Sequence, residues 1–238
     1  MSDLRYLDRA RLDALDAAYF QRRRPYPWIN PEGLLTDTGY AALLDALPDT
    51  PLFEEAFGVA RKHGQQSHDR YALEYRPGLP LDAAWHEFVA ELNGPVYTAF
   101  LQRMLGVRRV SLSCHWHYTP NGCSVSPHCD ARRKLGSHIF YFNTDKDWDP
   151  SWGGETLILD SDHPPKPESA PRLEDFERVT PSIAIGNRSL LFARTDHSWH
   201  AVRAIHCPPQ ALRRVFILVI EPGGGPSWWR RLRGQGGY

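Results

Sequence analysis

Two histidines, one aspartate and one arginine are the side chains of this chain whose types and spacing best suit chemistry. His128 and Asp130 are separated by one residue, His200 follows seventy residues after Asp130, and Arg214 lies fourteen residues further on. Two imidazoles and one carboxylate can bind one face of a ferrous ion and leave the remaining positions open. An arginine on a neighbouring strand could hold a dicarboxylate, because its planar guanidinium meets a carboxylate through two hydrogen bonds.

The His-x-Asp spacing suits an extended segment, since side chains alternate along a strand and His128 and Asp130 would share one face. Taken alone the motif carries little weight, because 11 histidines and 28 acidic residues produce about one such spacing by chance. His115 and His117 form a second pair of the kind found in cupin metal sites, but no acidic residue lies between His115 and residue 127. We expect His197 to point away from the ion, near the site or at the surface.

The elements that must position these residues change character near residue 107. The preceding residues predict mainly helix, at 10–21, 38–47 and 81–105, with the last helix interrupted at Gly94-Pro95. Short segments rich in β-branched and aromatic residues follow, separated by turn residues, as is typical of a sandwich or barrel. The predicted strands are 107–118, 137–143, 156–159, 182–185, 189–193, 200–205 and 214–220, and residues 162–171 predict a surface loop.

A series of short motifs surrounds the candidate ligands in a fixed order. They are Tyr118 with Gly122, His128-Cys129-Asp130, Tyr141-Phe142-Asn143, Trp148, Gly153-Gly154, Leu190-Leu191-Phe192, His200-Ala201-Val202 and Arg214. This order, between Tyr118 and Glu221, resembles that of the Fe(II)/2-oxoglutarate-dependent dioxygenases and most closely their prolyl hydroxylase-like branch. The resemblance covers less than half of the chain, and only the joint pattern is specific.

The resemblance implies a double-stranded β-helix, or jelly-roll (cupin-like), core behind N-terminal helices, a mainly β fold of α+β type. It makes His128, Asp130 and His200 the iron ligands. It places Arg214, Tyr118 and Tyr141 at the 2-oxoglutarate co-substrate, with Arg214 and Tyr141 on its distal carboxylate. The implied cofactors are Fe(2+), 2-oxoglutarate and O2, with ascorbate as an optional addition.

Arg213 is a rival to Arg214. The interval from His200 is longer than is usual in that branch, and Cys207-Pro208-Pro209 lies within it. Alternation favours Arg214, because the apolar residues Phe216, Leu218 and Ile220 would share its face. Phe216 stands where the branch often has serine, so the carboxylate needs a hydroxyl from elsewhere.

The implied function is a 2-oxoglutarate-dependent hydroxylase acting on an unactivated C–H bond of an amino acid, a peptide residue such as proline, or a small metabolite. Arg132, Trp148 and Arg194 are the candidate substrate contacts, since a cationic rim with aromatic walls suits an anionic substrate. The same residues could equally form a solvated loop and a packed core. The alternative functions are a cupin-like metal- or ligand-binding module that uses His115 and His117, and a sensor of 2-oxoglutarate or oxygen without turnover.

Composition limits the partners. The formal net charge is zero and the pI is about 7.2, so nothing in the overall charge predicts nucleic acid or a membrane surface. Four cysteines without a C-x-x-C motif, a charged beginning and no long apolar stretch predict a cytoplasmic protein with reduced thiols. We expect one domain over 1–222, divided into a helical part (1–106) and the jelly-roll core (107–222), and a flexible tail over 223–238; the oligomeric state is left open.

Overall fold

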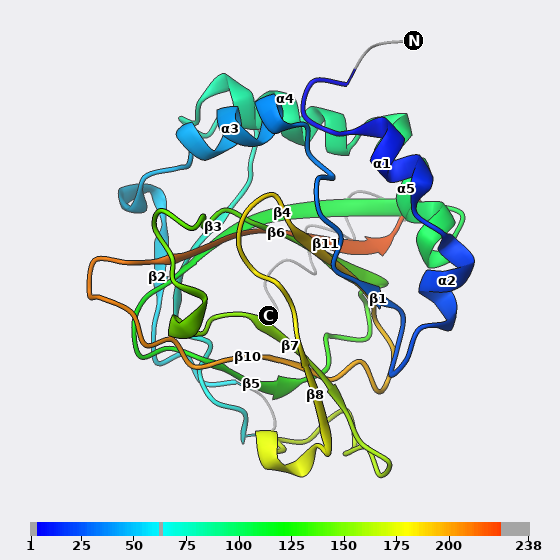
Figure 1. Ribbon diagram of the computed structural model, residues 1–238, viewed down its shortest axis with the longest axis vertical. Coiled ribbons are helices and arrows are strands. Elements are labelled where there is room, and N and C mark those ends of the chain that lie inside the picture. The colour runs from blue at the N-terminus through cyan, green and yellow to red at the C-terminus, as the bar shows by residue number, and fades with distance from the viewer. Residues whose placement is uncertain (1–3, 62–63, 225–238) are drawn as a thin grey trace.

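A computed structural model describes residues 4–61 and 64–224 of the chain. Two antiparallel sheets face each other, and Figure 1 shows the helices gathered on the outer side of the larger sheet. The larger sheet has the strand order β1 (Trp28–Ile29), β9 (Ser189–Ala193), β6 (Gly136–Tyr141), β11 (Arg213–Pro222), β4 (Val110–Thr119), β3 (Arg70–Glu74) and β2 (Glu54–Ala56). The smaller has the order β5 (Val125–His128), β10 (His200–Val202), β7 (Thr156–Asp160) and β8 (Arg178–Pro181). The predicted mainly β jelly-roll class is confirmed.

Four of the five described α-helices begin at a residue whose side chain accepts from a free backbone N–H group, and the fifth begins after a glycine. The helices are α1 (Arg9–Ala14), α2 (Ala17–Arg22), α3 (Asp37–Asp45), α4 (Ala83–Leu92) and α5 (Pro95–Leu105), with short 3-10 turns at Thr50–Leu52, Pro150–Trp152 and Leu173–Asp175. The predicted helix at 10–21 is divided, because Leu15 is extended and Asp16 caps a second helix. The predicted break at Gly94-Pro95 is confirmed, with Pro95 at the first position of α5.

The central strand β11 separates two apolar layers by the alternation of its side chains. Phe216, Leu218 and Ile220 face the helices, where Phe216 lies 5.0 Å from Trp85 between ring centroids. Val215 faces the smaller sheet and packs in a separate cluster with residues of β6, β7 and β9. Burial of each such large apolar side chain contributes about 1.5–3 kcal/mol. The face of β11 that looks toward the smaller sheet is the one that can border a site.

Several elements differ from the sequence-based expectation. The first 106 residues were expected to be mainly helical, but they also supply β1, β2 and β3 to the larger sheet. The segment 182–185 is not a strand; β8 ends just before it, at Pro181. Strands β5 and β8 were not predicted from the sequence. β8 is an exposed edge strand and β5 has only four residues, so neither has a clear apolar pattern. Residues 225–238 of the predicted tail lie outside the described residues.

No helix within residues 4–61 and 64–224 is long and apolar enough to cross a membrane. All four cysteines, which belong to the described part of the chain, are free thiols.

Candidate metal centre and its cavity

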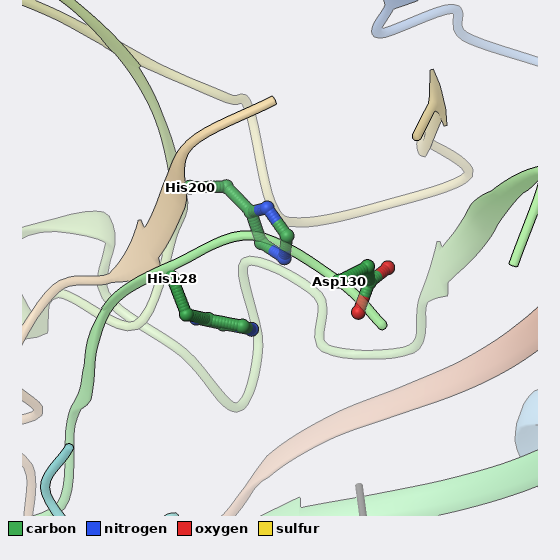
Figure 2. Close-up of side chains that lie close together, drawn as sticks. All are labelled: His128, Asp130 and His200. Carbon is green, nitrogen blue, oxygen red and sulfur yellow. The ribbon is translucent and has the colours of Figure 1, made fainter. Parts of the chain in front are cut away.

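His128, Asp130 and His200 come together between the two sheets. Each offers a ligand atom, and these atoms all lie within 4.8 Å of one another (Figure 2). His128 ends β5 and His200 begins β10, and the two residues are direct partners in the antiparallel register of these strands. The pairing of β5 with β10 therefore brings His128 and His200 together, although they are far apart in the sequence. In the described parts of the chain, no other group of three or more His, Cys, Asp or Glu side chains is this close together.

Both histidines are held so that Nε2 is free to bind an ion. His128 Nδ1 lies 3.0 Å from the carbonyl oxygen of Ser126, and His200 Nδ1 lies 2.9 Å from that of Ser198. A carbonyl can only accept, so Nδ1–H donates in each case and fixes the tautomer. Burial lowers the pKa of both imidazoles below the ordinary value, which keeps them neutral. A neutral imidazole oriented through Nδ1 is the usual state of a metal-binding histidine.

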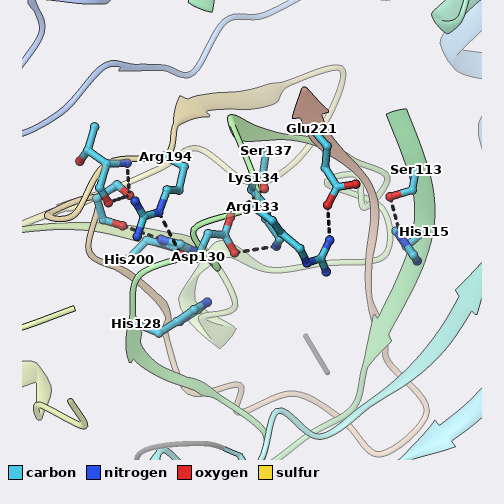
Figure 3. A network of polar contacts seen from close by, with 12 residues as sticks. Ser113, His115, His128, Asp130, Arg133, Lys134, Ser137, Arg194, His200 and Glu221 are labelled. Carbon is cyan, nitrogen blue, oxygen red and sulfur yellow. Dashed lines mark hydrogen bonds and ion pairs between the residues drawn. The ribbon is translucent and has the colours of Figure 1, made fainter. Parts of the chain in front are cut away.

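Asp130 supplies the anionic ligand. Ser137 Oγ donates to its Oδ2 at 2.9 Å and Lys134 Nζ donates to its Oδ1 at 2.7 Å (Figure 3). Burial alone would raise the pKa of this carboxyl, but the charge and the hydrogen bond of the Lys134 ammonium hold it well below the ordinary value. The group is therefore ionised at neutral pH. Two neutral imidazoles and one carboxylate are a donor set that fits Fe(II).

The three side chains border a cavity of about 360 Å³. The inner face of the larger sheet contributes His115 and His117 from β4 and Ile217 and Val219 from β11. Strands β5, β7 and β10 of the smaller sheet form the facing wall. The cavity is within the range of about 300–1,000 Å³ that is typical of small-molecule sites.

Arg213 is the arginine of β11 that faces this cavity. Its side chain is buried, its Nε donates to the carbonyl oxygen of Gly154, and its Nη2 lies 3.5 Å from Thr156 Oγ1. Tyr141 lies beside it, with the guanidinium carbon 5.9 Å from the ring centroid, and Tyr141 Oη donates to Thr156 Oγ1 at 3.1 Å. Burial lowers the pKa of the guanidinium. Arg213 has no carboxylate partner among the described residues, so an anionic ligand would complete its surroundings.

The prediction that chose Arg214 and Tyr118 is wrong about the face of the sheet. Arg214 points away from the cavity and forms an ion pair with Asp147 at 3.5 Å. Tyr118 is its partner on β4; it donates to the carbonyl oxygen of Pro48 at 3.0 Å and packs on Phe53. Arg214 does share a face with Phe216, Leu218 and Ile220, as alternation predicted. That face is covered by the helices, whereas the site lies on the opposite one.

The other predicted residues are divided between the cavity and its surroundings. Arg132 and Arg194 line the cavity, and their contact with a substrate stays a prediction. Trp148 does not, because its ring packs against Ile205 and Cys207 and its Nε1 donates to the carbonyl oxygen of Gly153 at 3.2 Å. The alternative pair His115 and His117 lines the cavity but finds no third ligand among the described residues. His197 is exposed, as expected.

Arg61, His68 and Ser137 are among the cavity residues that were not predicted from the sequence. Lys134 belongs to the basic run after Asp130, where the signal was charge alone. Arg61 and His68 precede β3, in a segment that carries no motif.

Comparison with known proteins agrees with this geometry. The family model described as the 2OG-Fe(II) oxygenase superfamily matches residues 113–219, which contain all three candidate ligands and Arg213. The match covers less than half of the chain. Members of this superfamily use Fe(2+), 2-oxoglutarate and O2, and the donor set of His128, Asp130 and His200 fits that use.

Solved structures with similar folds come from the same group of enzymes. A Pseudomonas putida prolyl-4-hydroxylase has a TM-score of 0.61 at 17% identity, covering 87% of this chain and 99% of its own. A Trichoplax adhaerens prolyl hydroxylase, in complex with a hypoxia inducible factor peptide fragment, has a TM-score of 0.66 at 16% identity and covers 95% and 94%. The carbocyclase SnoK of nogalamycin biosynthesis has a TM-score of 0.59 at 11% identity and covers 89% and 85%. At these identities the likeness shows the fold. A comparison with curated proteins finds no match.

Proposed function

We propose that the chain is a 2-oxoglutarate-dependent hydroxylase whose iron is bound by His128, Asp130 and His200. The observation that carries the proposal is the position of these three side chains on one cavity wall, with both Nε2 atoms free of backbone partners. The intact carboxylate of Asp130 completes the ligand set. When bound, the iron would supply an oxidative decarboxylation in which O2 gives one oxygen atom to 2-oxoglutarate, forming succinate and CO2, and the other to a substrate C–H bond, forming a hydroxyl group.

Arg213 would hold the distal carboxylate of 2-oxoglutarate. Gly154 fixes the guanidinium through Nε, which leaves the Nη atoms to donate to a ligand. Thr156 and Tyr141 present hydroxyl groups at the same place, and Thr156 lines the cavity. These hydroxyl groups would take the place of the serine that the prolyl hydroxylase-like branch often has at the position of Phe216. The buried position of Arg213 excludes water, which strengthens its interaction with an anion.

The remaining cavity wall would orient the substrate. Apolar side chains of β6, β9 and β11 (Ile139, Phe192 and Ile217) can pack against its carbon skeleton. Arg132 and Arg194 lie on the polar side of the cavity, where a carboxylate or a peptide group could be bound. The substrate is accordingly an amino acid, a residue such as proline within a peptide, or a small metabolite. A cytoplasmic location, the use of ascorbate and the division into a domain over 1–222 and a tail stay predictions from the sequence.

Substitution of the ligands tests the assignment. His128→Ala and Asp130→Ala should each abolish iron binding, measured by metal analysis after dialysis, and substrate-independent formation of succinate from 2-oxoglutarate. His115→Ala removes an imidazole from the same cavity and serves as the matched control, which should retain both properties. Loss of metal in His115→Ala together with retention in His128→Ala would refute the site.

A further inference from the structure

The cavity is strongly cationic. Six of its described lining residues are basic and two are acidic, and the acidic ones are Asp130 and Glu168. The basic residues are Arg61, Arg132, Arg133, Lys134, Arg194 and Arg213. Since Asp130 would bind the metal, the cavity has more positive charge than the co-substrate alone requires. The basic residues that have no carboxylate partner within the protein are the ones whose positive charge is available to a ligand.

Four of these six residues have a carboxylate partner within the protein. Arg132 lies 3.6 Å from Glu168, Lys134 lies 2.7 Å from Asp130 and Arg194 lies 2.7 Å from Asp196. Arg133 is paired with Glu221 (Figure 3). Arg61 and Arg213 have no such partner in the described part of the chain. Two guanidinium groups are therefore available for anions, and Arg213 would take 2-oxoglutarate.

Arg61 is half-buried, and its Nη1 is shielded from solvent without a hydrogen-bond partner among the described residues. Burial lowers the pKa of this guanidinium by more than the nearby Asp130 carboxylate raises it. A shielded donor without an acceptor costs free energy, more so when it is charged. An anionic ligand would remove that cost.

The charge of Arg61 reaches His68, as that of Arg213 does, but its other interactions in the cavity differ. It interacts with Asp130, His128 and His200, which places it beside the candidate metal centre. The charge of Arg213 interacts instead with Tyr141 and with the carboxylate of Glu155. An anion bound by Arg61 would lie next to the reacting centre, where the substrate has to be.

We infer that Arg61 binds a carboxylate of the substrate, and that the substrate is a small molecule of amino-acid size with a free carboxylate. The inference rests on the proposed function, because it assigns Arg213 to 2-oxoglutarate. The size follows from the volume: 2-oxoglutarate must share about 360 Å³ with the substrate, at the lower end of ligand sites. A long peptide would leave most of its surface outside such a cavity.

A panel of free amino acids, each paired with its own carboxamide, tests the inference on the wild-type protein, Arg61→Gln and Arg133→Gln. Arg133→Gln is the matched control, because it removes the same charge from the same cavity but from a group already paired with Glu221. Binding is measured by ligand-observed NMR in the presence of 2-oxoglutarate, and turnover by succinate formed above background. Unfolding midpoints of the three proteins establish that each variant is folded.

We expect wild type to bind carboxylates at least about tenfold more tightly than the matching amides, the size of one charge-assisted hydrogen bond. Arg61→Gln should remove that preference, and Arg133→Gln should keep it. The apparent KM for 2-oxoglutarate without substrate should stay within about twofold in Arg61→Gln, since this residue would not touch the co-substrate.

Three results would overturn the inference. The first is that the wild-type protein binds acids and amides equally, or binds no acid at millimolar concentration. The second is that Arg61→Gln keeps the preference for acids. The third is a large increase in the KM of Arg61→Gln for 2-oxoglutarate, which would mean that Arg61 contacts the co-substrate. Failure of the proposed function has a different signature, because the wild-type protein would then form no succinate from 2-oxoglutarate. Binding of the panel acids would still report on Arg61.

Discussion

Two adjacent arginines on β11 should differ sharply in their effect on 2-oxoglutarate. Arg213 faces the cavity and Arg214 faces the opposite side of the sheet, although one peptide bond separates them. Arg213→Gln removes the charge and the fork of donors while keeping a side chain of similar length. We expect the apparent KM for 2-oxoglutarate to rise strongly in this variant and to change little in Arg214→Gln.

The magnitude follows from the contacts of Arg213. Nε is used by the carbonyl of Gly154, so the Nη atoms remain for a carboxylate. Hydrogen bonds to a charged group contribute about 1.5–3 kcal/mol each, and one to two such bonds amount to about 3 kcal/mol. That corresponds to a rise in KM of about 100-fold. Arg214 forms a partly exposed ion pair with Asp147, and such pairs contribute about 0–1 kcal/mol to folding.

Succinate formation at varied 2-oxoglutarate concentration measures both KM values, and thermal unfolding shows whether either variant is damaged. Because the substrate is unknown, the substrate-independent reaction is used. Equal KM values for Arg213→Gln and Arg214→Gln, or a larger effect at Arg214, would refute the assignment of the cavity face. An unchanged KM in both variants would mean that another cation of the protein binds the co-substrate.

Two further predictions concern a glycine and a buried histidine. Gly154 has φ +81° and a Cβ there would lie 3.0 Å from Arg213 Cδ, whereas Gly122 has φ +79° and open space around it. Both alanine variants should lose about 1–3 kcal/mol of stability, but only Gly154→Ala should raise the KM for 2-oxoglutarate; equal KM values would contradict the contact. Burial lowers the pKa of His138 to about 3, so the unfolded chain binds one more proton between that pH and about 6.5. Stability should fall as pH falls through this window, and His138→Gln should reduce the slope by about 1.4 kcal/mol per pH unit; an unchanged slope in denaturant unfolding would contradict the buried neutral state.

The candidate metal ligands could be predicted because their signal is local and ordered. His128 and Asp130 are separated by a single residue, and the surrounding motifs follow one another along the chain. Tyr141 was chosen for the same reason; it lies beside Arg213, and its contact with 2-oxoglutarate stays a prediction. The strand at 189–193 was found with both of its bounds, since an apolar run between turn residues is a strong strand signal.

The choice between Arg213 and Arg214 could not be made from the sequence, although the alternation was read correctly. A strand between two layers has two buried faces, and both are rich in apolar residues. Phe216, Leu218 and Ile220 mark the face that packs on helices, while Val215, Ile217 and Val219 mark the face toward the smaller sheet. Periodicity groups the residues of a face but does not say what covers it. Only the position of the helices decides that.

The segment before β3 raises the question of where substrate choice is encoded. The matched residues 113–219 contain the candidate metal ligands and Arg213, the residues that the proposed function assigns to iron and 2-oxoglutarate. Arg61 and His68 lie outside that range, yet both line the cavity beside the metal centre. Gln65 of the same segment donates to the carbonyl oxygen of Ser169 at 3.1 Å, which joins it to the loop that carries Glu168. The segment before β3 and the loop that carries Glu168 thus border the same side of the cavity. The part of the chain with the weakest sequence signal is therefore the part from which selectivity should arise.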